Sequence, residues 1–231
     1  MTENREHIAQ EIKAEFMRSL AERFGREQER KLNNYRQQNE YIKRGKTLFT
    51  GSSLMEQFPI AEYCLNDGLP VAYNRGIGGY TTDDFLAAID TVLLDPQPSK
   101  LFINIGTNDI RPMPEGEDWF EHLSKNYRRI CDIIREKLPD AEVYMMAYYP
   151  VNGHVALAQD NSAMRVRTNE NIDRANRMVR KLAEEYGFNY IDVNDGLKDE
   201  QGNLKAERTM DGIHFDPAGY RTVFERLKKY L

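Results

Sequence analysis

The feature that most constrains the fold is a repeating sequence pattern that begins at Thr47. From there to the C-terminus, short apolar runs alternate with segments of helical periodicity. Strands joined by helices usually run parallel, with helices covering both faces of the sheet, so this alternation predicts an α/β fold with a parallel sheet. The expected strands are 48–49, 71–73, 101–105, 141–149 and 188–193, and the expected helices are 59–65, 83–94, 119–138, 170–186 and one starting near Pro217.

The residues before Thr47 form a region with a different sequence pattern. Large apolar residues recur there at every fourth position among charged ones, which predicts a helix up to about Gln38, with Gly25 as a candidate break. We expect residues 1–45 to form a helical extension and residues 46–231 to form one α/β domain. The helix either packs on the flank of that domain or serves as a homodimerisation arm or a lid near the site. Its apolar residues are Ile8, Ile12, Phe16, Leu20 and Phe24.

Composition excludes several classes of function. A length of 231 residues suits one domain, and a net charge of −5 with interspersed signs gives no broad basic surface, so we expect no nucleic-acid partner. Cys64 and Cys131 lie in apolar patterns, which predicts buried free thiols. The N-terminus lacks an apolar run, and no segment suits a membrane span. The sequence therefore predicts a cytoplasmic protein without stable membrane insertion.

Clusters of polar residues and glycine follow each expected strand. Ligands of parallel α/β sheets bind beyond the carboxyl ends of the strands, so five unrelated clusters at such ends predict one shared site. The clusters are Gly51-Ser52-Ser53, the stretch 74–79, the stretch 106–109, Tyr148-Tyr149 and the stretch 211–214.

The last of these clusters has the composition of a proton-transfer pair. Asp211 and His214 are three residues apart, and a carboxylate that fixes the imidazole tautomer makes histidine a directed base. Ser53 is the candidate nucleophile, although a serine after a strand is also a common helix N-cap, and Ser52 competes for either role. The segment does not fit the GxSxG elbow, because Met55 occupies the place of the last glycine.

The glycine-rich loop and the strand-end amide suggest anion stabilisation. Gly79 could offer a backbone N–H and Asn108 a side-chain N–H to an oxyanion, with a tight turn as the alternative for each. Thr81 breaks the GxGxxG pattern, so no dinucleotide is expected. Asp211 and His214 have the spacing of metal ligands, but no further histidine lies in an obvious strand-end cluster. We therefore expect no metal and no organic cofactor.

Taken together, these clusters resemble the four blocks of the SGNH hydrolases, also called GDSL-type esterases. The resemblance covers Thr47 to the C-terminus and implies a flavodoxin-like three-layer α/β/α sandwich. It assigns Ser53 as nucleophile, His214 as base and Asp211 as its orienting carboxylate. The N–H of Ser53, the N–H of Gly79 and the Asn108 amide would form the oxyanion hole.

One position departs from the family pattern, because Ser52 stands where the family usually has aspartate. That position carries no proton-transfer role, so the change affects the local geometry more than the chemistry. The sequences of the second block (74–79) and the third block (106–109) resemble those of the branch of platelet-activating-factor acetylhydrolases and lysophospholipase-like esterases.

The resemblance implies a serine esterase that forms an acyl-enzyme on a small-molecule ester, and we expect short acyl groups. Two alternatives stay open: a carbohydrate O-deacetylase with the same triad, and a catalytically silent binding protein on the same fold. The expected substrate-binding residues are Tyr80, Tyr148, Tyr149 and Val151.

Overall fold

A single parallel sheet of five strands organises the molecule. The computed structural model describes residues 2–231, with side chains from residue 10 onward. All strand pairs are parallel, in the order β2-β1-β3-β4-β5. The strands are β1 (Thr47–Gly51), β2 (Tyr73–Asn74), β3 (Lys100–Asn104), β4 (Glu142–Met146) and β5 (Asn189–Ile191).

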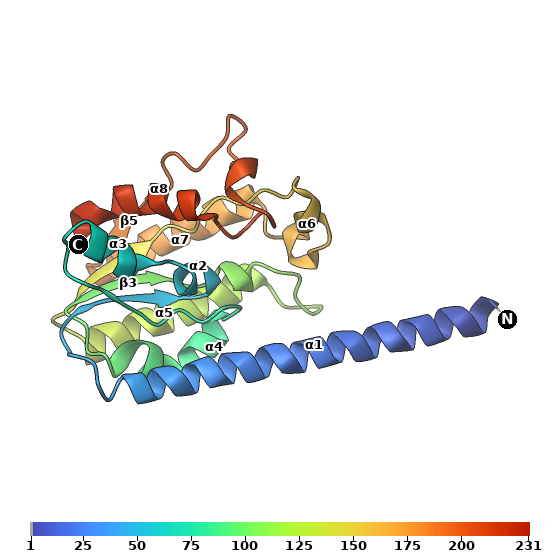
Figure 1. The fold of residues 1–231 in the computed structure, drawn as a ribbon, viewed down its shortest axis with the longest axis horizontal. Coiled ribbons are helices and arrows are strands. Elements are labelled where there is room, and N and C mark those ends of the chain that lie inside the picture. The colour runs from blue at the N-terminus through green and yellow to red at the C-terminus, as the bar shows by residue number, and fades with distance from the viewer. Residues whose placement is uncertain (1) are drawn as a thin grey trace.

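Helices cover both faces of this sheet (Figure 1). In that view α4 and α5 lie below the sheet and α8 lies above it, and α7 packs against α5. The predicted three-layer α/β/α sandwich is therefore confirmed. The α-helices are α1 (Thr2–Gln38), α2 (Ser53–Glu56), α3 (Ile60–Asn66), α4 (Thr82–Ala87), α5 (Trp119–Lys137), α6 (Ala156–Gln159), α7 (Asn169–Tyr186) and α8 (Pro217–Leu227).

Aromatic side chains on one face of the sheet bind the layers together. Register places Phe49, Phe102 and Tyr144 side by side on neighbouring strands, and their rings stack at centroid distances of 4.5 and 4.7 Å. Phe58 meets Phe49 edge-on and stacks on Tyr220 of α8. Because such pairs stabilise beyond the apolar area they bury, they fix α8 on this face of the sheet.

The helix boundaries follow local capping chemistry. Asp216 caps α8 by accepting from the Gly219 N–H at 2.6 Å, with Pro217 as the first helical residue, as the sequence predicted. The predicted helix 83–94 is wrong in detail. A capping box between Thr81 and Asp84 starts α4 one residue earlier, and the chain then changes to a π-helix, η1 (Asp90–Leu94).

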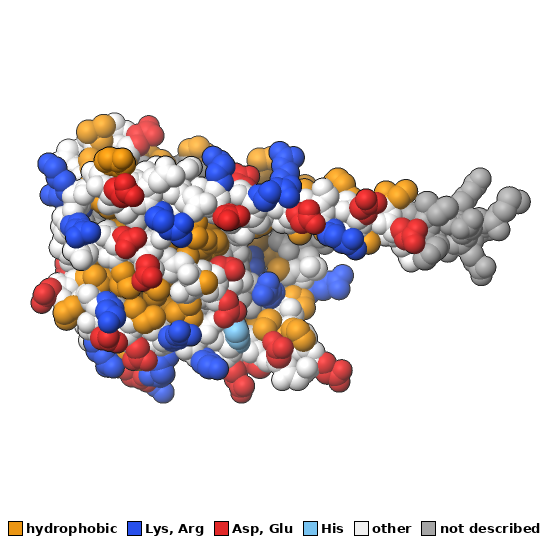
Figure 2. Space-filling view, turned by 90° about the horizontal axis from the view of Figure 1, so that it is seen from below, with side chains coloured by type: hydrophobic (Ala, Val, Ile, Leu, Met, Phe, Trp, Pro, Cys, Tyr) orange, Lys and Arg blue, Asp and Glu red, His pale blue; other side chains and the backbone are white. Residues whose placement is uncertain are grey.

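Helix α1 is continuous, so Gly25 is not a break. Its end near the domain is anchored by Asn39, whose side chain donates to Thr91 O and accepts from Arg75 Nε. The outer segment of α1, residues 10–24, is exposed and projects past the body of the molecule (Figures 1 and 2). No helix in the described part of the chain has both the length and the apolar character to cross a membrane. Cys64 and Cys131 are buried and free, as expected.

Candidate active site

The end of β1 turns sharply so that one serine is presented and its neighbour is buried. Gly51 has φ of 151°, and a side chain there would place its Cβ only 2.0 Å from Asn104 O, so the turn requires glycine. Ser52 precedes α2 and is 2% exposed, whereas Ser53 is the first residue of α2 and is partly exposed. The structure thus separates the two serines that the sequence left in competition.

Ser53, His214 and Asp211 lie in one hydrogen-bonded row. His214 Nε2 is 2.7 Å from Ser53 Oγ, and His214 Nδ1 is 2.5 Å from Asp211 Oδ2. The serine and the histidine are 161 positions apart in the sequence. The imidazole therefore contacts a hydroxyl with one nitrogen and a carboxylate with the other, the arrangement in which a histidine can take a serine proton.

The surroundings of Asp211 keep it ionised. Burial alone would raise its pKa, but the His214 ring and the backbone N–H groups of His214 and Ile213 all interact with the carboxylate. Their combined effect holds the pKa of Asp211 well below its usual range. The loop itself is anchored at Gly212, which has φ of 84° and whose carbonyl accepts from the Asn152 N–H at 2.8 Å.

The three predicted oxyanion donors are the N–H groups of Ser53 and Gly79 and the Asn108 amide. The N–H of Ser53 is the first of a helix, and such groups have no intrahelical acceptor. Among the residues that the structure describes, neither this N–H nor that of Gly79 donates to a protein oxygen. Asn108 lies in a short 3-10 turn after β3, and its Nδ2 donates to Tyr80 O at 3.0 Å. The Asn108 amide is thereby placed beside the Gly79–Tyr80 loop.

Arg167 is a buried residue that the sequence gave no reason to single out. Its side chain comes from the long loop before α7, is 5% exposed, and donates from Nη2 to Asn108 Oδ1 at 3.3 Å. Burial lowers its pKa to about 10, which Asp109 partly offsets, so it stays a cation at neutral pH. The contact with a guanidinium fixes which end of the Asn108 amide is oxygen and leaves the Nδ2 end as the donor.

Asp109 ties two of the loops together. It accepts from the Thr82 N–H at 3.0 and 3.2 Å and from Thr82 Oγ1 at 2.5 Å. Burial raises its pKa to about 6 despite these bonds. The carboxylate thus organises the loops around Asn108.

Glu56 is a second residue that the sequence analysis missed. It ends α2, the helix that Ser53 begins, and its carboxylate accepts from the Gly78 N–H and pairs with Lys31 of α1. Gln28 of α1 donates to Gly78 O at 2.7 Å. A single charged residue without a local motif gives no sequence signal, since these contacts appear only when α1, α2 and the glycine loop meet.

The expected substrate-binding residues lie in the core. Tyr148, Tyr149 and Val151 are 0%, 3% and 4% exposed, and Tyr80 is 6% exposed. The Tyr148 hydroxyl donates to Ile105 O at 2.7 Å and lies against the backbone of Gly106, so it supports the loop of Asn108 from behind. In this structure Tyr148, Tyr149 and Val151 have almost no free surface on which a substrate could lie. The chain at the end of β4 is buried on both sides, which is why these residues pack into the core and do not line a pocket as the sequence predicted.

Within the described residues no group of three or more His, Cys, Asp or Glu side chains is arranged to hold a metal ion. His154 is exposed in its loop. His122 lies 2.7 Å from Asp83 at the start of α4 and takes no part in the row that contains Ser53.

Comparison with known proteins identifies the family. Residues 50–222 match the GDSL-like lipase/acylhydrolase family, which covers more than half of the chain, and the chain belongs to this family. It is therefore a carboxylic ester hydrolase, and the resemblance to SGNH hydrolases is confirmed.

Individual relatives agree in fold. A Streptococcus pneumoniae protein, solved under the designation platelet activating factor, is 31% identical, with a TM-score of 0.83 over 94% of this chain and 98% of that one. An acetylxylan esterase from Geobacillus stearothermophilus has a TM-score of 0.60 at 18% identity, over 81% and 95% of the two chains. The Escherichia coli N-acylneuraminate cytidylyltransferase is 30% identical over 159 residues, which are 66% of this chain and 33% of the relative. This chain thus spans about a third of that relative.

Proposed function

We propose that this protein is a serine esterase that cleaves carboxylic esters through an acyl-enzyme on Ser53. The observation that carries the proposal is the row of two short contacts from Asp211 through His214 to Ser53. A hydroxyl becomes a competent nucleophile when an adjacent base takes its proton and a third group orients that base. The family membership restricts the chemistry to ester hydrolysis.

In the first half-reaction, His214 Nε2 takes the Ser53 proton as Oγ attacks the ester carbonyl. Asp211 holds the ring through Nδ1 and stabilises the imidazolium that forms. His214 then gives the proton to the leaving alkoxide. In the second half-reaction a water attacks the acyl-enzyme, and His214 acts first as base and then as acid toward Ser53.

The tetrahedral intermediate needs donors at its oxyanion. The N–H groups of Ser53 and Gly79 and the Nδ2 of Asn108 are the proposed donors. Asn108 would exchange its bond to Tyr80 O for one to the oxyanion, with Arg167 holding the other end of the amide. A single such donor stabilises the transition state by about 3–4 kcal/mol.

We propose a short acyl group as the preferred one. Tyr148, Tyr149 and Val151 are packed into the core behind the strand ends, which limits the depth available behind Ser53. Acetyl esters of sugars are a second candidate substrate, because an acetylxylan esterase from Geobacillus stearothermophilus shares this fold.

The test is hydrolysis of p-nitrophenyl acetate, butyrate, octanoate and palmitate, alongside a panel of acetylated sugars. Ser53→Ala should remove turnover on every ester, while the matched control Ser52→Ala should keep most of it. Loss of activity in Ser52→Ala with retention in Ser53→Ala would refute the assignment of the nucleophile. Folded protein that cleaves none of these esters would favour the silent binding protein.

A further inference from the structure

The outer segment of α1 carries apolar side chains that its own domain leaves exposed. Ile12, Phe16, Leu20 and Phe24 are 62%, 64%, 49% and 51% exposed. They follow one another at every fourth position, so they form a continuous ridge along the helix rather than scattered residues. A large contiguous apolar patch on a protein surface usually marks an interaction site.

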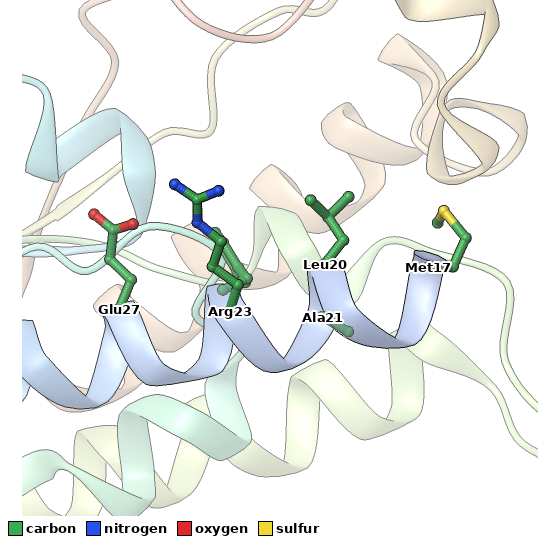
Figure 3. A pocket seen from close by; sticks show the side chains of 6 residues that line it. Met17, Leu20, Ala21, Arg23 and Glu27 are labelled. Carbon is green, nitrogen blue, oxygen red and sulfur yellow. The ribbon is translucent and has the colours of Figure 1, made fainter. Parts of the chain in front are cut away.

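A groove lies beside this ridge on the same helix (Figure 3). It is a hollow of about 460 Å³ whose walls and floor come from one helix alone, and Ala21 is its smallest lining residue. Two helices pack when the ridge of one enters the groove of the other, and pairing of i±4 ridges gives a crossing angle near −50°. The lining residues are Met17, Leu20, Ala21, Arg23, Phe24 and Glu27.

The outer segment contains both parts of such a contact. The ridge from Ile12 to Phe24 is symmetric about position 18, so a two-fold axis there brings Ile12 of one helix opposite Phe24 of another. Phe16 then meets Leu20 in the same way. This surface is self-complementary when the two helices are antiparallel.

Charges beside the ridge favour the antiparallel direction. By helical periodicity, Glu15 and Arg23 lie on the same flank of the ridge, two turns apart. A two-fold axis across an antiparallel pair brings equal flanks together in reversed order, so Glu15 of one helix approaches Arg23 of the second helix. In a parallel pair Glu15 and Arg23 of the two helices would lie about 12 Å apart along the axis and could not pair.

We propose that this surface binds a second copy of the chain, with the two α1 helices crossing antiparallel at position 18. A lipid surface suits it less well. Residues 10–24 contain three acidic and three basic residues, whereas helices that lie on membranes carry polar faces rich in Lys and Arg. The dimer does not depend on the proposed function.

The dimer also completes the surroundings of the active site, and this part rests on the proposed function. The ring of Phe24 lies 2.6 Å from the position of a Cβ added at Gly79, so the ridge ends on the proposed oxyanion loop. In the antiparallel pair, Ile12 of the second copy lies beside Phe24. Each site therefore receives an apolar wall from the other chain, next to the N–H of Gly79.

The first experiment is light scattering after size-exclusion chromatography, and sedimentation velocity over a dilution series. Wild type and Ser53→Ala should both have the mass of a dimer, which separates assembly from activity. Leu20→Glu should weaken the dimer by roughly 30-fold or more, as for a central interface residue. The matched control Ala14→Glu adds the same charge on the opposite side of the helix and should leave the dimer intact. A monomeric wild type, or equal effects of both substitutions, would overturn the proposal.

Crosslinking tests the direction of the helices. Both native cysteines are buried, so a cysteine introduced on α1 is the accessible thiol. Single variants Ile12→Cys and Phe24→Cys, mixed and treated with a mild oxidant, should give mixed 12–24 disulfides. Like positions are about 18 Å apart along the axis of an antiparallel pair, too far for a disulfide. Disulfides between like positions would show a parallel pair and refute the model.

Two further measurements complete the test. If wild type were monomeric and sedimented with phosphatidylcholine vesicles, the partner of the ridge would be a lipid surface and not a second copy of the chain. For the active-site wall, Leu20→Glu should lower kcat/KM on a butyrate ester by roughly 3-fold, while Ala14→Glu should not. A fully active Leu20→Glu monomer would remove the wall and leave the serine esterase standing.

Discussion

The catalytic edge of the sheet and the outer segment of α1 differ in how their side chains are satisfied. Around Ser53, His214 and Asp211, polar groups are held by hydrogen bonds from several loops, including those of Gly79 and Asn108. Along α1, the ridge of Ile12 to Phe24 faces solvent with few contacts to its own domain. The polar groups of the catalytic edge find their partners within the chain, whereas the outer segment of α1 has the composition of an interface.

The boundary between the two regions lies at Phe24 and Gln28. From Gln28 toward the domain, α1 donates hydrogen bonds to the glycine loop at Gly76 and Gly78, while before Phe24 it leaves the domain. The helix is therefore part of the site at one end and a surface for a partner at the other. Substitutions at the catalytic edge should change the activity and leave the mass of the assembly unchanged. Substitutions in the outer segment should change the mass of the assembly first.

The largest effect is expected from Asp211→Asn. The amide keeps the shape but cannot hold the His214 tautomer or stabilise the imidazolium, so kcat should fall by about 10⁴-fold. Because the pKa of Asp211 is held well below its usual range, wild type keeps this carboxylate ionised throughout an assay between pH 5 and 9. Asp216→Asn, which changes the cap of α8 and the ion pair with Arg208, is the control and should keep most activity. A loss below tenfold in Asp211→Asn would contradict the triad.

Asn108→Ala removes one proposed oxyanion donor. The expected loss in kcat is about 10²- to 10³-fold with little change in KM, because the donor acts on the transition state more than on bound substrate. Steady-state kinetics on the butyrate ester measures both constants. A rise in KM at constant kcat would instead assign Asn108 to substrate binding.

The raised pKa of Asp109 predicts a pH-dependent stability. Its folded pKa is about 6 and its unfolded value is near 3.9, so between these values the folded state binds the proton more tightly. Rising pH through this window should therefore reduce the unfolding free energy by up to roughly 2–3 kcal/mol. Asp109→Asn lacks this ionisation and should show a flatter profile in urea unfolding from pH 4 to 7. Equal slopes for the two proteins would contradict the raised pKa.

The parts of the site that the sequence predicts are those with local motifs at strand ends. Gly51, Ser53, Asn108 and His214 each stand in a short pattern, and parallel strands bring those patterns to one edge. Five strands and most helices were predicted for the same reason, since periodicity and capping are local. Cytoplasmic location remains a prediction of the sequence.

The parts that escaped prediction depend on packing between distant segments. The sequence could not show that Tyr148 lies beneath Gly106 rather than in a substrate pocket, because the direction of a side chain after β4 depends on how the chain leaves the sheet. Glu56 and Arg167 are isolated charged residues whose partners come from other elements. Equally, the spacing of the ridge on α1 predicted a helix but left its partner open.

Arg167→Met tests whether the guanidinium positions the Asn108 amide. Removing the contact at 3.3 Å should let the amide rotate, and kcat should fall by roughly 10-fold while KM changes little. Arg167→Lys keeps the charge without the planar fork and should recover part of the rate. In an Asn108→Ala background the Arg167→Met substitution should cost little more, because the group it positions is gone. Additive losses in that double variant would show that Arg167 acts elsewhere.

The smallest effect is expected where the two regions meet. Gln28→Ala removes the 2.7 Å bond to Gly78 O and loosens the oxyanion loop without touching the ridge. We expect kcat to fall by roughly 3-fold, equivalent to a single neutral hydrogen bond, with the dimer unchanged. Gln38→Ala, which truncates an exposed side chain at the domain end of the same helix, is the matched control and should retain full activity. If Gln28→Ala changed the mass and left kcat intact, this end of α1 would belong to the interface, and the boundary would lie closer to the domain.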